Sequence, residues 1–306
     1  MADDTDGSAT RGPDILFTGP HRSGTTLVCS LLNALPGAVA LHEPLTVPLL
    51  TQNRGPALCD AIDEFCTRNR RTLVEDGYAQ SGLVDGAFVS NTASSGGSVR
   101  KLLDRLPTPL SDRLLGGVGV RTGMARHGKF RVDKAVSEPF TLVLKQPAAF
   151  TAALPTLAER FMCIAIVRNP LATLASWNTV DFKRGGRAAI AEKIDPTLGP
   201  RLDAIRNRYD RQVDLLSWFF DRYRALPREQ VITYEALCDD PAATLTPLVP
   251  EAATVSADLA NRNRNTIYNG KLVPKLAQRL LASDGAFWDF YDRASVEQLA
   301  SAFAQG

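Results

Sequence analysis

The residues best suited to chemistry lie in a turn near the amino terminus, at residues 19–26. Its sequence is Gly-Pro-His-Arg-Ser-Gly-Thr-Thr. The apolar run at 15–18 before it has the pattern of a strand, and the stretch at 27–32 after it has that of a helix. A strand, a glycine-containing turn and a helix together present backbone N–H groups to an anion, usually a phosphate. We therefore predict an oxyanion site at this turn.

Four side chains of the turn add hydrogen-bond donors, namely Arg22, Ser23, Thr25 and Thr26. The spacing almost fits the Walker A loop, but Thr25 stands where that loop needs lysine. A nucleotide triphosphatase also needs an acidic residue after a second strand to hold magnesium. The best candidate strand, 161–167, is followed by Arg168 and Asn169 instead. The turn is therefore predicted to bind a phosphate-like group without a metal, the alternative being a tight turn with no ligand.

Composition limits the function classes. The chain has 306 residues, a net charge of +2 and five cysteines without a C-x-x-C pair. The near-neutral charge argues against a general nucleic-acid binder, and the odd cysteine count argues against a disulfide framework or zinc site. No apolar run reaches the roughly 20 residues of a membrane span. Residues 1–13 are polar and lack the features of a signal peptide, so we expect a disordered leader and a cytoplasmic protein.

Apolar runs alternate with helical patterns along the chain. We predict strands at 15–18, 39–41, 141–144, 161–167 and 231–234, and helices at 27–32, 150–159, 171–178, 206–226, 273–281 and 285–303. This alternation is typical of an α/β fold, a parallel sheet covered by helices on both faces. Two segments, 46–140 and 181–200, are expected to be irregular insertions in a single domain of residues 14–306, although residues 57–71 in the first have helical spacing.

Charged residues follow three of the predicted strands. Glu43 comes after 39–41, Lys145 after 141–144 and Arg168 after 161–167. Open α/β sheets bind their ligands at the carboxyl ends of the strands. Glu43 is therefore expected at the carboxyl edge of the sheet, and Lys145 and Arg168 are noted as strand-end residues.

Two stretches resemble the sulfotransferases that use 3′-phosphoadenylyl sulfate (PAPS). Residues 19–27 are similar to their 5′-phosphosulfate-binding loop, and residues 166–177 are similar to their 3′-phosphate-binding segment. The resemblance implies a three-layer fold of the P-loop type. It also implies that Arg168 and Ser176, eight residues later, bind the 3′-phosphate. For the first turn, the resemblance implies that the cofactor is bound by Arg22, Ser23, Gly24, Thr25 and Thr26.

Two further positions agree with this resemblance. Residues 231–237 are similar to the family's Tyr-Glu-x-Leu segment, which implies an adenine-side contact for Tyr234. The alternative for Tyr234 is a core tyrosine at a strand end. Asn269-Gly270-Lys271 resembles the C-terminal Gly-Lys loop that closes over the cofactor, which implies that Lys271 contacts it.

The resemblance also suggests the catalytic cations. Arg22 matches the arginine of the Golgi-type and many bacterial branches, and Lys145 lies in a segment similar to the Lys-x-Pro of carbohydrate and tyrosyl-protein sulfotransferases. Negative charge builds on the bridging oxygen as the sulfuryl group leaves, and cationic donors stabilise it. Arg22 and Lys145 are the expected donors, with Lys271 as a possible third.

The acceptor hydroxyl needs a general base. The cytosolic branch uses a histidine in the middle of the chain, whereas this chain has only His21, His42 and His127. The carbohydrate and tyrosyl-protein branches use a glutamate shortly after the first helix, and Glu43 occupies that place. Glu43 is thus the predicted base. His42 is expected to point to the opposite face, because adjacent strand residues alternate.

The predicted reaction moves a sulfuryl group in line from PAPS to an acceptor hydroxyl and leaves 3′-phosphoadenosine 5′-phosphate (PAP). The acceptor is expected on a carbohydrate, a small metabolite or a peptide tyrosine, with no nucleic acid and no membrane span involved. Two alternatives stay open: a P-loop kinase or nucleotide triphosphatase, and a non-catalytic protein that binds PAP or another nucleotide.

Overall fold

The computed structural model describes residues 11–83, 126–132, 134–179 and 186–304. Five parallel strands form the central sheet, in the order β2-β5-β1-β6-β7. Their bounds are Asp14–Thr18 for β1, Ala38–His42 for β2, Thr141–Lys145 for β5, Met162–Val167 for β6 and Val231–Thr233 for β7. All five predicted strands are present, and the predicted α/β parallel sheet is confirmed.

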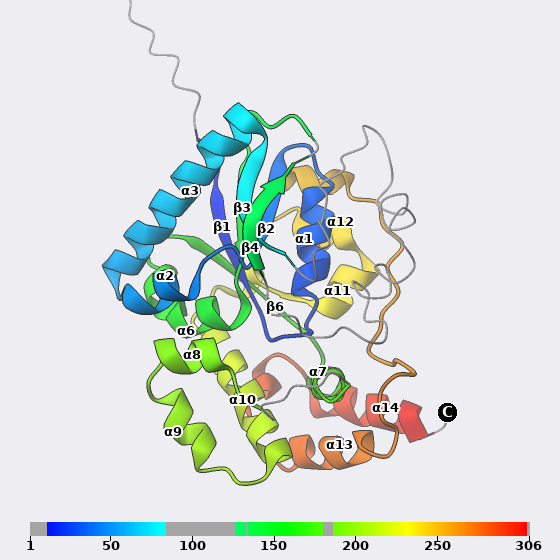
Figure 1. Cartoon of the computed structure of the whole chain (residues 1–306). Helices are drawn as coiled ribbons and strands as arrows, with labels where there is room; N and C mark the ends of the chain where they lie inside the picture. Colours follow the sequence, from blue (N-terminus) through cyan, green and yellow to red (C-terminus); the bar gives the residue numbers. More distant parts are fainter. Residues whose placement is uncertain (1–10, 84–125, 133, 180–185, 305–306) are drawn as a thin grey trace, which may run out of the picture.

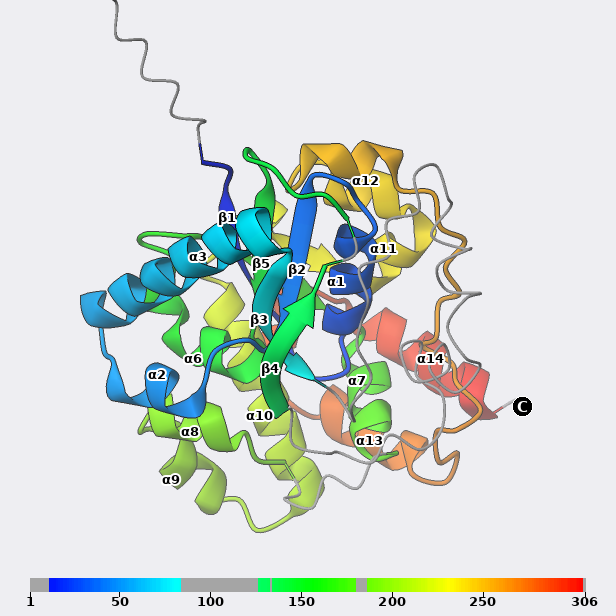
Figure 2. The same ribbon diagram turned by 45° about the horizontal axis from the view of Figure 1, so that its top comes forward.

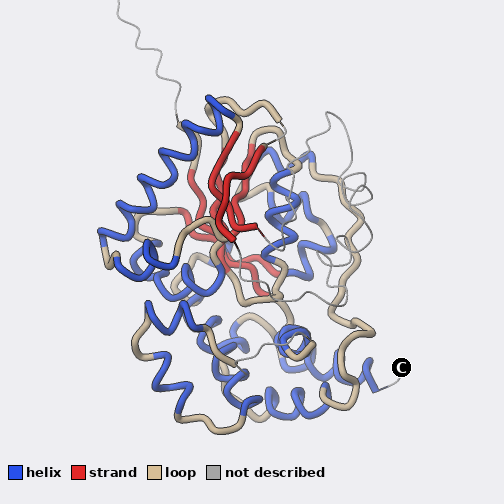
Figure 3. The backbone as a smooth tube through the Cα atoms, in the orientation of Figure 1, coloured by secondary structure: helices blue, strands red, loops and turns tan. Residues whose placement is uncertain are grey.

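Helices flank this sheet on both sides, as Figure 3 shows. They are α1 (Thr25–Asn33), α2 (Val47–Gln52), α3 (Pro56–Asp76), α6 (Pro147–Leu157), α7 (Pro170–Trp177), α8 (Ala189–Ile194), α9 (Leu198–Asp203), α10 (Arg208–Tyr223), α11 (Tyr234–Asp239), α12 (Pro241–Leu245), α13 (Val273–Leu281) and α14 (Arg293–Ala304). Single 3-10 turns occur at Arg228–Gln230, Pro250–Thr254 and Ala286–Asp289. Among these helices, none is both long and apolar enough to cross a membrane.

The strands are apolar throughout because both faces of the sheet are buried. Alternate residues enter two separate cores. Phe17 and Val143 pack in the core that contains α1, α11 and α12, whereas Leu16 and Leu144 pack in the core that contains α3, α6 and α10. The result is a three-layer sandwich of helices, sheet and helices, as predicted.

The register of the sheet brings its carboxyl ends together. Lys145 at the end of β5 lies opposite both Phe17 of β1 and His42 of β2. On the other side of β1, Thr18 pairs with Ala165 of β6, so β6 extends slightly further. The segments that follow these strands therefore all start at one edge.

An antiparallel pair of strands covers the open edge of β2 (Figure 2). It consists of β3 (Tyr78–Leu83) and β4 (Arg126–Arg131). The hydroxyl of Ser81 in β3 accepts a hydrogen bond from the backbone N–H of His42 at 3.0 Å. This pair of strands thus provides a partner for a backbone N–H at the edge of β2 that would otherwise be unpaired.

Both segments expected to be irregular contain regular structure. The first includes α2, the 21-residue α3, β3 and β4, and the second includes α8 and the start of α9. Helix α3 confirms the helical spacing at 57–71, and it buries one apolar stripe with Leu58, Ile62 and Phe65 on it. Helices α2, α8 and α9 have only six residues each, too short for a periodic pattern to stand out. Residues 84–125 and 180–185 lie outside the described residues, as do residues 1–10 of the predicted leader.

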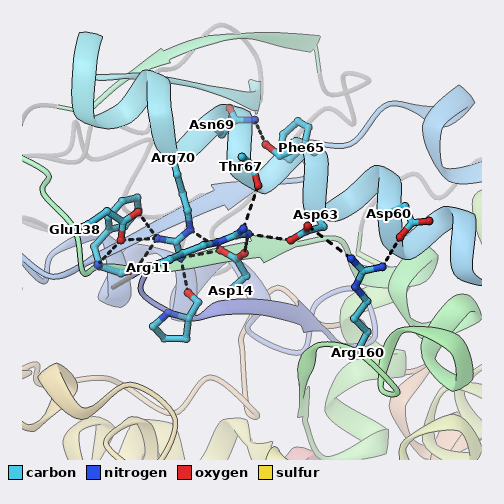
Figure 4. Close-up of polar contacts among 12 residues, drawn as sticks. Arg11, Asp14, Asp60, Asp63, Phe65, Thr67, Asn69, Arg70, Glu138 and Arg160 are labelled. Atoms are coloured by element: carbon cyan, nitrogen blue, oxygen red, sulfur yellow. Dashed lines mark hydrogen bonds and ion pairs between the residues drawn. The ribbon is translucent and has the colours of Figure 1, made fainter. Parts of the chain in front are cut away.

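A buried arginine joins the amino ends of the strands (Figure 4). Arg70 of α3 donates from Nε to Asp14 at 2.8 Å, from Nη1 to Glu138 at 2.9 Å and from Nη2 to the carbonyl of Pro13 at 2.7 Å. Its Nη1 also donates to the carbonyl of Phe140, and the guanidinium lies 4.4 Å from the centre of that ring. Arg70 therefore fixes α3 to the starts of both β1 and β5.

Replacing Arg70 is expected to destabilise the protein strongly. An Arg70→Met variant leaves two carboxylates without their buried partner, which costs about 3–5 kcal/mol. The free energy of unfolding in denaturant measures this loss. Arg68→Met is the matched control on the same helix, because Arg68 is exposed and 3.7 Å from Glu64, and we expect it to change stability by about 0.5 kcal/mol or less. Similar values for the two variants would contradict the role of Arg70.

Candidate functional site

The turn between β1 and α1 has a glycine in the left-handed region directly before an uncapped helix start. Gly24, the residue before α1, has φ 104°, and a Cβ atom there would lie 2.9 Å from the ring of Tyr234. Glycine is required for both reasons. No side chain caps α1, so the N–H groups of its first turn have no acceptor within the helix. These groups are available to an anion at the edge of the sheet.

The hydroxyl groups of the turn have different surroundings. Ser23 is fully buried and donates from Oγ to the carbonyl of Pro20 at 2.7 Å, and its backbone N–H donates to the same carbonyl. Ser23 thus shapes the turn, and its contact with a ligand stays a prediction. Thr25 and Thr26 are the first two residues of α1.

Arg22 connects the turn to α7. Its Nε donates to Ser176 Oγ at 3.0 Å, and its backbone carbonyl accepts from Nη1 of Arg168 at 3.1 Å. Ser176 is almost fully buried, and burial lowers the pKa of Arg22, with the charge of Arg168 acting in the same direction. The two halves of the site predicted from separate motifs are therefore in direct contact.

Arg168, directly after β6, is buried among polar partners. Its Nε donates to Asn263 Oδ1 at 2.8 Å. Its Nη2 donates to the carbonyl of Arg262 at 2.5 Å and to the hydroxyl of Tyr268 at 3.2 Å. Most of its donors thus bind the protein itself, and Arg168 holds the segment 262–268 against the first turn.

Tyr234 lies between the two motifs. One side of its ring approaches Gly24, and the guanidinium of Arg168 lies 4.4 Å from the ring centre. Its hydroxyl accepts from the backbone N–H of Arg262 at 3.1 Å, and burial raises the pKa of Tyr234. The ring is buried in the core, as the alternative interpretation had it, and the contact with adenine stays a prediction.

A salt bridge joins Lys145 to Glu43. The Nζ of Lys145 lies 2.7 Å from Oε1 of Glu43, with the lysine side chain 7% exposed and the glutamate side chain 38% exposed. The backbone helps to place the carboxylate, because Glu43 has φ 45° and its N–H donates to the carbonyl of Lys145 at 2.7 Å. The charge of Lys145 lowers the pKa of Glu43 to about 2.

Two histidines surround this salt bridge. Burial lowers the pKa of His21, and it lowers that of His42 to about 3, so both rings are neutral at pH 7. His21 packs edge-on against Phe219. His42 is buried, and its Nε2 has no hydrogen-bond partner among the described residues.

Lys271 lies apart from the other predicted site residues, and its contact with the cofactor stays a prediction. Lys271 is exposed, its N–H donates to Asn269, and no contact among the described residues links its side chain to the rest of the site. The residues near Arg168 are Arg262, Asn263 and Tyr268. We did not predict these three residues from the sequence. Residues 261–265 alternate between asparagine and arginine, and this run of hydrogen-bonding side chains was the signal that could have identified two of them.

Within the residues that the structure describes, no group of three or more His, Cys, Asp or Glu side chains has the arrangement of a metal site. The charged side chains that the structure gathers at this edge are arginine, lysine and glutamate. These are groups that bind anions and transfer protons.

Comparison with known proteins gives distant structural similarity. No family model matches the chain, and no curated protein matches it significantly. It is similar to the sulfotransferase domain of a Synechococcus olefin synthase, with 17% identity over 96% of both chains and a TM-score of 0.35. It is also similar to a sulfotransferase from Alicyclobacillus acidocaldarius, with 16% identity over 96% of this chain and 100% of that chain and a TM-score of 0.38. Similarity at this level carries no argument about function, which we base on the site.

The Lys145–Glu43 salt bridge predicts a pH-dependent contribution to stability. The folded pKa of Glu43 is lowered to about 2, from an ordinary value of about 4.3. The contribution is therefore present above pH 4.3 and is lost as the pH falls towards 2. We expect the difference in unfolding free energy between wild type and Glu43→Gln to narrow between pH 5 and pH 3. In a Lys145→Met background, the effect of Glu43→Gln on the unfolding free energy should not change with pH. If its effect in the wild-type background were also independent of pH, the contribution assigned to the salt bridge would be contradicted.

Proposed function

We propose that this protein is a PAPS-dependent sulfotransferase. One observation carries the proposal: the anion-binding turn, with Arg22 in contact with Ser176 and Arg168, lies at the same sheet edge as the Lys145–Glu43 salt bridge. The first group of residues suits a ligand with two phosphate-like ends. The second suits proton transfer beside a leaving oxygen. The resemblance of residues 19–27 and 166–177 to PAPS-binding segments supports the same function.

The residues present fit such a ligand. The uncapped start of α1 and Arg22 provide donors for the 5′-phosphosulfate end. Arg168 and Ser176 provide donors for the 3′-phosphate. Arg262 adds a guanidinium whose buried Nε has no hydrogen-bond partner among the described residues, as expected of a donor reserved for an anion.

In this proposal Glu43 accepts the proton of the acceptor hydroxyl as that oxygen attacks. PAPS, when bound, supplies an activated sulfuryl group on a phosphate leaving group. Arg22 and Lys145 donate hydrogen bonds to the leaving oxygen, where negative charge builds. A single donor to a developing oxyanion contributes about 3–4 kcal/mol in acyl-transfer enzymes. PAP is the second product.

The salt bridge has a consequence for Glu43 as a base. A carboxylate whose pKa is about 2 accepts a proton poorly. When Lys145 donates to the leaving oxygen instead, Glu43 loses the charge that lowers its pKa, and the pKa of the carboxyl group rises. The salt bridge is thus the resting arrangement, and its separation activates Glu43.

The acceptor is proposed to be a hydroxyl on a carbohydrate, a small metabolite or a peptide tyrosine. A kinase or nucleotide triphosphatase is the less favoured alternative, because Arg168 and Asn169 follow β6 where magnesium would need a carboxylate. A non-catalytic nucleotide-binding protein would have no use for the Lys145–Glu43 pair at its ligand edge. The cytoplasmic location stays a prediction.

Sulfuryl transfer tests the role of Glu43. With labelled PAPS and a panel of phenols, amino sugars and tyrosine peptides, wild-type protein should label at least one acceptor. Glu43→Gln should lower the transfer rate by about 10²–10⁴-fold, because the base is lost. PAP binding by calorimetry should be retained. Glu64→Gln, an exposed residue on α3, is the control and should match wild type. An undiminished transfer rate in Glu43→Gln would refute the role of Glu43 as general base.

Nucleotide preference tests the role of Arg168. Arg168→Lys keeps the charge but loses the planar guanidinium that pairs with phosphate. We expect its affinity for PAP to fall about 10–100-fold, the value of one or two charged hydrogen bonds, and its affinity for 5′-AMP to change little. Arg201→Lys, a surface arginine on α9, is the control. Equal losses for the two nucleotides would show that Arg168 does not recognise the 3′-phosphate.

A further inference from the structure

We propose that Glu235 is a positioning residue, which orients the guanidinium of Arg168 through Asn263 and so sets the preference for a 3′-phosphorylated nucleotide. The orientation is a property of the structure itself. Its consequence for nucleotide preference rests on the proposed function. Neither residue is placed in contact with the ligand.

Both carboxylate oxygens of Glu235 are occupied by donors from distant parts of the chain. Oε1 accepts from the backbone N–H of Asn169 at 2.9 Å and from Nδ2 of Asn263 at 2.6 Å. Oε2 accepts from the hydroxyl of Tyr291 at 2.7 Å. These contacts hold the carboxylate of α11 between the end of β6, the segment 262–268 and the C-terminal region.

Tyr291 serves as a permanent donor in this arrangement. Burial raises the pKa of Tyr291 well above its ordinary value, and the charge of Glu235 acts in the same direction. The phenol therefore keeps its proton throughout the neutral range. One oxygen of Glu235 is fixed in this way, and the other is left for Asn263 and Asn169.

Asn263 can adopt only one amide orientation between its two neighbours. A carboxylate only accepts hydrogen bonds, and a guanidinium only donates them. The NH₂ group of Asn263 must therefore face Glu235, and its oxygen must face Arg168, where Nε lies 2.8 Å away. Glu235 thus fixes the amide, and the amide fixes Nε of Arg168.

The remaining contacts of Arg168 explain why Nε matters. The two Nη groups donate to the backbone carbonyls of Arg22 and Arg262, which belong to two different loops. Asn263 provides the side-chain acceptor on the Nε side of the guanidinium. Because Arg22 and Arg168 are both cations, a carboxylate two hydrogen bonds from Arg168 also stabilises their close approach.

The orientation is tested directly by the ¹⁵N signal of the Arg168 Nε–H group, identified by its loss in Arg168→Lys. In Asn263→Ala we expect this signal to shift and its exchange with solvent to accelerate by about tenfold or more, because the buried hydrogen bond is gone. Glu235→Gln keeps the size of the side chain but no longer dictates the amide orientation, and it should change the signal in the same direction. Asn265→Ala is the control in the same loop, because Asn265 accepts from Ile267 and does not contact Arg168. An unchanged signal in Asn263→Ala, or an equal change in Asn265→Ala, would overturn the proposal.

Nucleotide binding tests the consequence. We expect Asn263→Ala and Glu235→Gln to lower the preference for PAP over 5′-AMP by about 10-fold or more, as for other residues that orient a binding group. The affinity for 5′-AMP should stay unchanged. An equal loss of affinity for PAP and for 5′-AMP would indicate a purely structural role and would refute a role in nucleotide preference. If wild-type protein shows no preference for PAP, the proposed function fails, and the Arg168 signal still decides whether Glu235 and Asn263 orient the guanidinium.

Discussion

The parallel register of β1, β2 and β5 is the constraint on which the site depends. It places Lys145 level with both Phe17 and His42, so the residues that follow three strands meet at one edge. A shift of one residue would turn each side chain to the other face of the sheet. The register is held because each strand buries apolar residues on both faces, with Leu144 in one core and Val143 in the other. Packing far from the ligand edge thus determines the geometry of the Lys145–Glu43 pair.

Two carboxylates balance the cations at this edge in different ways. Glu43 pairs directly with Lys145 and remains partly exposed, which is compatible with the base role proposed for it. Glu235 is held by three donors and reaches Arg168 only through Asn263, which suits a group that must stay in place. The difference lies in the number of hydrogen bonds each one accepts from the protein. In the proposed mechanism Lys145 leaves Glu43, whereas Glu235 keeps Arg168 in a fixed orientation.

Much of this arrangement could be predicted from the sequence, because apolar runs and turn residues are local signals. The strand before Arg168 and the turn around Gly24 were found in this way, and so were the positions of Glu43 and Lys145 at strand ends. The contact of Asn263 with Arg168 could not be found, since it joins residues 95 positions apart through a loop without periodicity. Helix α8 was missed because six residues show too little of a helical period. The prediction that Lys271 contacts the cofactor was based on a two-residue match and stays a prediction. The sequence did not indicate that Arg262 lies beside Arg168.

The buried guanidinium of Arg70 lies at the amino ends of the strands, on the opposite side of the sheet from the candidate site. Its partners, Asp14 and Glu138, flank the starts of β1 and β5. The most extensive buried ion pairing described above therefore lies at the margin opposite the candidate site. Loops at the carboxyl margin can change in length and sequence without disturbing the contacts of Arg70 at the amino margin. A scaffold divided in this way can change its substrate without losing its fold.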